Sequence, residues 1–153
     1  SDSFVNGIFD PKGLHVMRAD FYVLPTSDPI AFACRLLEKT HQEKHTVFVL
    51  AQTKETAEQL DKQLWTFKDI SFIPHHLANN QTDHSSPIAI STNINDAQTH
   101  DVLLLLTPEL PEKYASFERV MMVIPDVSEW KQQARESYKV VKGLGVEINM
   151  HKM

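Results

Sequence analysis

Val102-Leu-Leu-Leu-Leu106 is an unbroken apolar run, and two further runs have the same character, Val47-Phe-Val-Leu-Ala51 and Val120-Met-Met-Val-Ile124. A strand with one face in water alternates apolar and polar side chains, whereas a strand covered on both faces is apolar throughout. Such short runs are more typical of buried strands than of helices, which are usually longer. The three runs therefore predict a sheet with helices on both of its faces.

Helical patterns lie between these runs. The first has apolar residues at i, i+3, i+4 and i+7, namely Ile30, Ala33, Cys34 and Leu37. Asp28 can cap this helix, and Pro29 suits its first turn. Thr53 can cap a second helix, whose apolar face comprises Ala57, Leu60 and Leu64. Alternating strands and helices imply a mainly parallel sheet. We therefore predict an α/β three-layer sandwich, Rossmann-like but without a nucleotide-binding glycine loop.

The rest of the sequence predicts the remaining strands, helices and loops. We expect strands at 21–24, 88–90 and 146–148, a brief extended piece at 70–74, a short helix at 111–117 and a long helix at 127–142. A polar loop spans 79–86. The first sixteen residues hold two of the four glycines and show no sustained period. We expect them to be an expression remnant or a disordered extension, followed by a single domain at 17–153.

Composition narrows the class of protein. The chain has 153 residues, about one domain's worth, and 42% of them are apolar. Its single cysteine, Cys34, excludes an internal disulfide and fits a reducing cytosol. No apolar run approaches the ~20 residues of a membrane helix. The net charge of −5 argues against strong direct binding of nucleic acid, which favours a basic surface.

Motifs for nucleotide, metal and thiol chemistry are weak. Beyond residue 16 the glycines are Gly143 and Gly145, and neither follows the first strand, where a phosphate-binding loop would lie. The adjacent His75 and His76, with His84 nearby, lack the spacing of metal ligands. Cys34 lies on the apolar helix stripe and is expected in the core. We therefore predict no cofactor, no metal and no catalytic residue.

The C-terminal helix carries two neighbouring stripes. One is cationic, at Lys131, Arg135, Lys139 and Lys142, and the other is apolar, at Trp130, Ala134, Tyr138 and Val141. Each stripe follows one helix face because its members are three or four residues apart. The apolar stripe can simply pack on the sheet while the cations are solvated. Alternatively, the two stripes form a groove for an acidic peptide with an apolar end.

A second cluster of large apolar side chains lies around an irregular connection, at Trp65, Phe72, Ile73 and Pro74. These residues can belong to the core. They can also form an exposed patch of the kind that marks a partner site.

Several segments together resemble the chi subunit family of bacterial DNA polymerase III, in the family's order and spacing. They are Asp20-Phe-Tyr-Val-Leu24, Leu60-Asp-x-x-Leu-Trp65, Phe72-Ile-Pro-His75 with Leu77-Ala78, Pro87-Ile-x-Ile90, and Lys131-Gln-x-Ala-Arg135-Glu-x-Tyr138-Lys139. The resemblance covers nearly all of residues 17–153. The sequence departs from the family at His76, where a member has asparagine, and in the loop at 79–86, which is not glycine-rich.

This resemblance implies a non-catalytic adaptor in the cytoplasm. Family members pair with the psi subunit, which tethers them to the clamp loader, and they bind the acidic C-terminal tail of single-stranded DNA-binding protein, which ends in phenylalanine. Carried over by position, the tail site comprises Ile124, Lys131, Arg135, Tyr138 and Lys139. The psi-facing region comprises Trp65, Phe72 and Pro74. The alternative is a small α/β enzyme, a hydrolase or transferase, with a site near His75.

Overall fold

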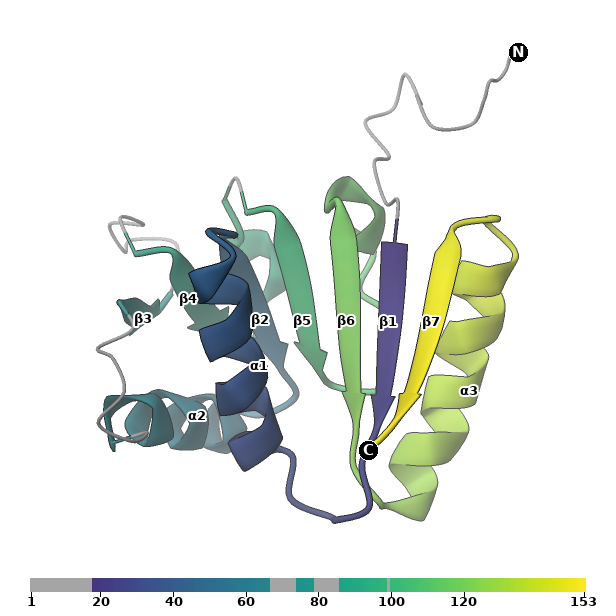
Figure 1. Ribbon diagram of the computed structural model, residues 1–153, viewed down its shortest axis with the longest axis horizontal. Helices are drawn as coiled ribbons and strands as arrows, with labels where there is room; N and C mark the ends of the chain where they lie inside the picture. The colour runs from purple at the N-terminus through teal and green to yellow at the C-terminus, as the bar shows by residue number, and fades with distance from the viewer. Residues whose placement is uncertain (1–17, 67–73, 79–85, 99) are drawn as a thin grey trace.

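The computed structural model describes residues 18–66, 74–78, 86–98 and 100–153. Within them, the strands form one seven-stranded sheet in the order β3-β4-β2-β5-β6-β1-β7, and every neighbouring pair is parallel (Figure 1). The strands are β1 Arg18–Val23, β2 Val47–Ala51, β3 His75–Leu77, β4 Ile88–Ser91, β5 Val102–Leu106, β6 Arg119–Ile124 and β7 Glu147–Lys152. The predicted parallel sheet is confirmed.

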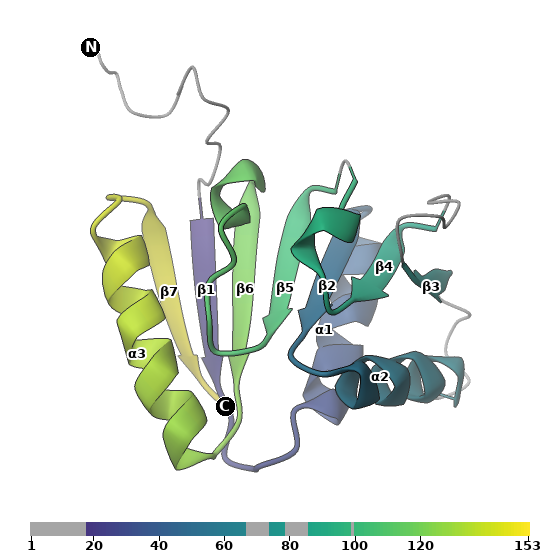
Figure 2. The same ribbon diagram turned by 180° about the vertical axis from the view of Figure 1, so that it is seen from behind.

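Helices cover both faces of the sheet. The helices α1 (Ile30–Gln42) and α2 (Lys54–Thr66) pack against the core on one face. In Figure 1, α1 lies in front of β2, and α2 lies lower, near the ends of β3 and β4. The long helix α3 (Ser128–Lys142) lies on the opposite face alongside β7, as Figure 2 shows, together with the short 3-10 turns η1 (Ile94–Asp96) and η2 (Tyr114–Ser116). The three-layer architecture is therefore confirmed. No helix among the described residues combines the length and apolarity needed to cross a membrane.

The core has two parts, one on each face of the sheet. Every residue of β2 and of β5 is buried, as expected for unbroken apolar runs. Along β1, Phe21 joins the α3 side and Tyr22 the α1 side, because successive strand residues point to opposite faces. Cys34 packs among the α1-side residues, and burial raises the pKa of its thiol to about 12. The thiol is therefore a core group, as predicted.

The helices α1 and α2 each begin near a residue whose side chain accepts a hydrogen bond from the first turn. The Asp28 carboxylate accepts a hydrogen bond from the Ile30 backbone N–H at 2.9 Å. The Thr53 hydroxyl accepts one from the Thr56 N–H at 3.1 Å. Both contacts satisfy backbone donors that have no partner inside the helix.

Some sequence-based expectations were wrong in detail. The helix predicted at 111–117 is reduced to the 3-10 turn η2, because a segment this short cannot repay the cost of starting an α-helix. The last strand is longer than the predicted 146–148, since β7 continues to Lys152. The strand β3 was not predicted. The extended piece predicted at 70–74 lies mostly outside the described residues, as do the first sixteen residues and most of the loop at 79–86.

A buried carboxylate joins the three strands at one end of the sheet. Asp20, in the middle of β1, has no exposed surface. It accepts hydrogen bonds from Arg119 of β6 at 2.8 Å and from His151 of β7 at 2.9 Å, and Arg18 lies 3.1 Å away. The imidazole of His151 also stacks on Tyr22, with ring centroids 4.5 Å apart. Burial acts to raise the pKa of Asp20, but the hydrogen bonds from His151 and Arg119 outweigh it, and the pKa lies below its ordinary value.

We expect Asp20→Asn to lower the free energy of unfolding by about 3 kcal/mol at neutral pH. Removing one partner of a buried ion pair costs roughly 3–5 kcal/mol, and both arginine side chains here retain some access to solvent, which favours the lower end. The measurement is urea unfolding of the two proteins.

The same comparison at low pH checks the cause. A carboxyl whose pKa is lower in the folded state stabilises the protein above its unfolded pKa, near 3.9, and the contribution is lost as pH falls through the folded pKa. The difference between wild type and Asp20→Asn should therefore shrink below about pH 4. A difference that stays constant down to pH 2 would show that the ionised carboxylate is not responsible.

Candidate peptide-binding site

A groove of about 370 Å³ lies between α3 and the adjoining ends of β6, β1 and β7. Its lining comprises Phe21, Val23, Ile124, Lys131, Ala134, Arg135, Tyr138, Met150 and Lys152. The strand residues alternate along each strand and so share the face that α3 covers. On α3, Lys131, Arg135 and Tyr138 share one side because each is one helical turn from the next.

Apolar groups form the floor of the groove. Phe21 is 2% exposed and meets Tyr138 edge to face, with ring centroids 5.4 Å apart. This contact fixes the tyrosine ring against the sheet. Ile124 lies at the end of β6, and Met150 of β7 is half-exposed at the other wall. The floor can therefore accept an apolar side chain without a rearrangement of the core.

The cations around the groove differ in their partners. Lys131 forms an ion pair with Asp126 at 2.5 Å. Arg135 on α3 and Lys152 on β7 have no carboxylate partner among the described residues, and both are exposed. They belong to opposite walls of the groove. A carboxylate between them would meet two cations that form no ion pair with the protein itself.

The other cations of the predicted stripe lie away from this groove. Lys139 pairs with Glu136 at 3.3 Å, and both side chains are largely in solvent. Lys142 lies over the ring of Tyr138, 6.0 Å from its centroid. Neither lysine contributes to the lining.

The structure thus brings together four of the residues predicted for tail binding, namely Ile124, Lys131, Arg135 and Tyr138. Lys139 lies outside the groove. Sequence reasoning missed Phe21, Val23, Met150 and Lys152. The alternation along residues 21–24 could have indicated the first two, but the last two belong to a strand that was predicted to end earlier.

This arrangement suits one kind of ligand, an anion attached to an apolar group. Guanidinium and ammonium groups form strong charge-assisted hydrogen bonds to carboxylates. An adjacent apolar floor removes hydrocarbon from water. On the apolar stripe, Ala134 and Val141 pack on the sheet, and Tyr138 contacts both the core and the groove, while peptide binding at this stripe stays a prediction.

The second predicted cluster lies at the opposite end of the sheet. Trp65, in the last turn of α2, is 55% exposed, and Pro74 is half-buried. Phe72 lies outside the described residues. The Trp65 ring lies against His75 of β3, with centroids 4.7 Å apart. An exposed tryptophan on an ordered helix is a candidate anchor for a partner protein.

His75, the residue considered for an enzymatic site, is buried. Its Nε2 lies 3.2 Å from the Asp61 carbonyl oxygen and 3.3 Å from the Asp61 carboxylate. These contacts and the Trp65 ring hold the imidazole between α2 and β3. No group of three possible metal ligands occurs among the described residues.

Comparison with known proteins gives one consistent family. Residues 16–149 match the family described as DNA polymerase III chi subunit, HolC. The chain is 32% identical to the DNA polymerase III subunit chi of Pseudomonas aeruginosa, over 89% of this chain and 96% of that protein. It is 29% identical to the subunit chi of Haemophilus influenzae, over 86% of this chain and 94% of that protein. For the Escherichia coli subunit chi the identity is 24%, over 86% and 95%.

Two adjacent residues of α2 test whether the Trp65 cluster is surface or core. Leu64→Ala should lower the free energy of unfolding by roughly 2–5 kcal/mol, because Leu64 is buried. Trp65→Ala should lower it by about 1 kcal/mol or less, because its ring is mostly in solvent. Chemical denaturation of both variants gives the comparison. Equal losses would assign Trp65 to the core and remove it as a partner anchor.

Proposed function

This chain belongs to the chi subunit family of DNA polymerase III, an accessory subunit of the replicative polymerase, and from this we propose that it is a non-catalytic adaptor. It pairs with the psi subunit, which links it to the clamp loader. It also binds the acidic C-terminal tail of single-stranded DNA-binding protein during replication in the cytoplasm. Neither role needs a cofactor or a metal.

The groove beside α3 is the main support for the tail-binding role. The tail requires a cation for its terminal carboxylate and an apolar surface for its terminal phenyl ring. Arg135 and Lys152 supply cations from two walls, and Phe21 and Tyr138 lie in the floor between them. A groove of about 370 Å³ is of the size that encloses one large side chain and its backbone.

The charge distribution favours this ligand over a nucleic acid. The chain as a whole carries a net charge of −5, which repels a phosphate backbone. Two cations of α3, Lys131 and Arg135, line the groove, and Lys139 and Lys142 lie further along the same helix. Acidic residues upstream in the tail can therefore be attracted to Lys139 and Lys142 at longer range. Such rim charges add little at physiological salt, where the screening length is about 8 Å.

The buried side chains considered for a catalytic role have surroundings that favour a structural role instead. The raised pKa of Cys34 leaves its thiol protonated at neutral pH, whereas a nucleophilic cysteine needs a lowered one. The imidazole of His75 is held by Asp61 and Trp65. These observations favour the adaptor over the α/β hydrolase or transferase with a site near His75.

The exposed Trp65 surface supports the proposed contact with psi. This surface comprises Trp65 and Pro74, and Phe72 is assigned to it from the family resemblance. It lies at the opposite end of the sheet from the tail groove, since α2 packs near β3 and β4 whereas α3 lies beside β7 (Figure 1). The two partners can therefore bind at the same time.

For the tail site, Arg135→Ala should weaken a peptide ending in acidic residues and Pro-Phe by tenfold to a hundredfold. A charge-assisted hydrogen bond contributes roughly 1.5–3 kcal/mol, and each 1.4 kcal/mol is a factor of ten. Lys152→Ala should weaken binding by about tenfold, because this side chain is more mobile and more easily solvated. Fluorescence polarisation with a labelled peptide measures the dissociation constants.

Two controls separate a carboxylate site from diffuse attraction. Lys139→Ala and Lys142→Ala should change the dissociation constant only slightly, and mainly at low salt. Amidation of the peptide's C-terminus should weaken binding to the wild type, and Arg135→Ala should then cause little further loss, because the two groups act on each other. Deletion of the terminal phenylalanine should abolish measurable binding. If the alanine variants at 135, 139 and 142 all behave alike, the carboxylate site does not exist.

For the psi contact, Trp65→Ala should reduce co-purification of psi with this chain. Loss of an aromatic anchor from an interface typically costs about 2 kcal/mol or more. The far-UV circular dichroism of the variant should match the wild type, and its tail-peptide affinity should be unchanged. Normal recovery of psi with a folded Trp65→Ala variant would place the psi surface elsewhere.

A further inference from the structure

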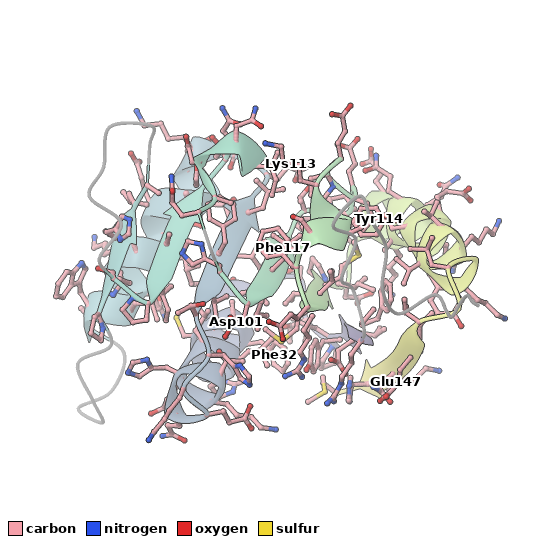
Figure 3. The ribbon with its side chains drawn as sticks, turned by 90° about the horizontal axis from the view of Figure 1, so that it is seen from above. Phe32, Asp101, Lys113, Tyr114, Phe117 and Glu147 are labelled. Carbon is pink, nitrogen blue, oxygen red and sulfur yellow. The ribbon has the colours of Figure 1, made fainter. Side chains whose placement is uncertain are left out.

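A second groove follows the other side of α3. It lies between this helix and the segment that joins β5 to β6, and its volume is about 550 Å³. The lining comprises Pro108, Glu109, Leu110, Pro111, Glu112, Tyr114, Gln133, Glu136, Ser137 and Val140. Figure 3 shows Tyr114 on that segment, near α3. No residue of this lining belongs to the tail groove.

The two walls of this groove are fixed to each other. The buried Ser137 hydroxyl donates a hydrogen bond to the Pro108 carbonyl oxygen at 2.7 Å. Leu110 and Tyr114 pack on the core beneath α3. The groove therefore has a set width, so a ligand would not have to bring the two walls together.

The lining of this second groove includes apolar side chains that are exposed to water, which is unfavourable. Val140 is 53% exposed although it is aliphatic, and the half-buried Leu110 and Pro111 lie on the opposite wall. The Tyr114 ring adds to this wall, and burial raises the pKa of its hydroxyl. A contiguous apolar surface of this kind, bounded by polar groups, is typical of a contact with another protein.

The charged residues of the lining are all acidic. They are Glu109, Glu112 and Glu136, and each is exposed. Glu136 pairs with the solvent-exposed Lys139, and such a surface pair contributes little. The single helix α3 thus separates a cationic groove from an acidic one.

We propose that this acidic groove binds a basic, partly apolar segment of a partner protein. Aliphatic side chains of that segment contact Val140 and Leu110, which removes them from water. Its lysine or arginine side chains meet the three glutamates at the rim. The apolar floor distinguishes this ligand from a free polyamine or a metal ion, because neither of these gains from contact with valine and leucine. The charge excludes a nucleic-acid backbone.

The test uses a synthetic peptide of about 15 residues, with lysine and arginine on one helical face and leucine on the other. Amide chemical shifts of the whole chain locate the binding surface, and fluorescence polarisation gives the affinity. We expect shifts concentrated at residues 108–114 and 133–140. A peptide of equal charge with serine in place of leucine should bind about tenfold more weakly, because it lacks the apolar contact.

Charge-matched variants provide the control. Glu109→Lys with Glu112→Lys should weaken the leucine peptide about tenfold at low salt. Glu55→Lys with Glu58→Lys changes the net charge equally on the exposed surface of α2, on the opposite face of the sheet, and should have little effect. Equal weakening by the two double variants would overturn the proposal, as would equal binding of the serine peptide or shifts centred on another surface. A dimer in sedimentation that Val140→Asp dissociates would also overturn it, by assigning the groove to a second copy of this chain.

Discussion

The buried carboxylate of Asp20 is the interaction on which the arrangement of β6, β1 and β7 depends. It lies in the central strand of three and receives Arg119 from one neighbour and His151 from the other. An isolated charge with no exposed surface would be prohibitively costly, so these partners are required once the carboxylate is buried. Their geometry ties β6, β1 and β7 together on the face that α3 does not cover. On the reverse face, the alternate residues of the same strands then line the groove beside α3.

This arrangement explains how an edge strand can form part of a binding site. Among the described strands, β7 pairs with β1 alone, and all six of its residues are at least partly exposed. An edge strand held only by backbone hydrogen bonds frays readily. The contact of His151 with Asp20 and its stacking on Tyr22 restrain β7 close to Met150 and Lys152. The contacts of His151 on one face of the sheet thereby position β7, which forms a wall of the groove on the other face.

The sequence predicted what depends on local pattern. The unbroken run at 102–106 identified a doubly covered strand, and the spacing of Lys131, Arg135 and Tyr138 identified three lining residues on one helix side. What it could not predict depends on which strands become neighbours. Lys152 faces Arg135 only because the last strand pairs with the first, and no local pattern encodes that pairing. The same limit applies to Asp20, because its partners Arg119 and His151 are 99 and 131 residues away along the chain.

The residues at the usual ligand site of this fold class disfavour the binding of a phosphate there. Open α/β sheets commonly bind ligands at the carboxyl ends of their strands, where a helix N-terminus can receive a phosphate. Here β1 leads into α1 through Pro25 and Pro29, and the Asp28 carboxylate already accepts the Ile30 N–H. A phosphate would meet a negative charge in place of a free donor. The anionic ligand that we propose is instead held by side chains beside α3, where Arg135 and Lys152 form no ion pair with any described carboxylate. We therefore expect side-chain placement, rather than topology, to determine which anion a fold of this class binds.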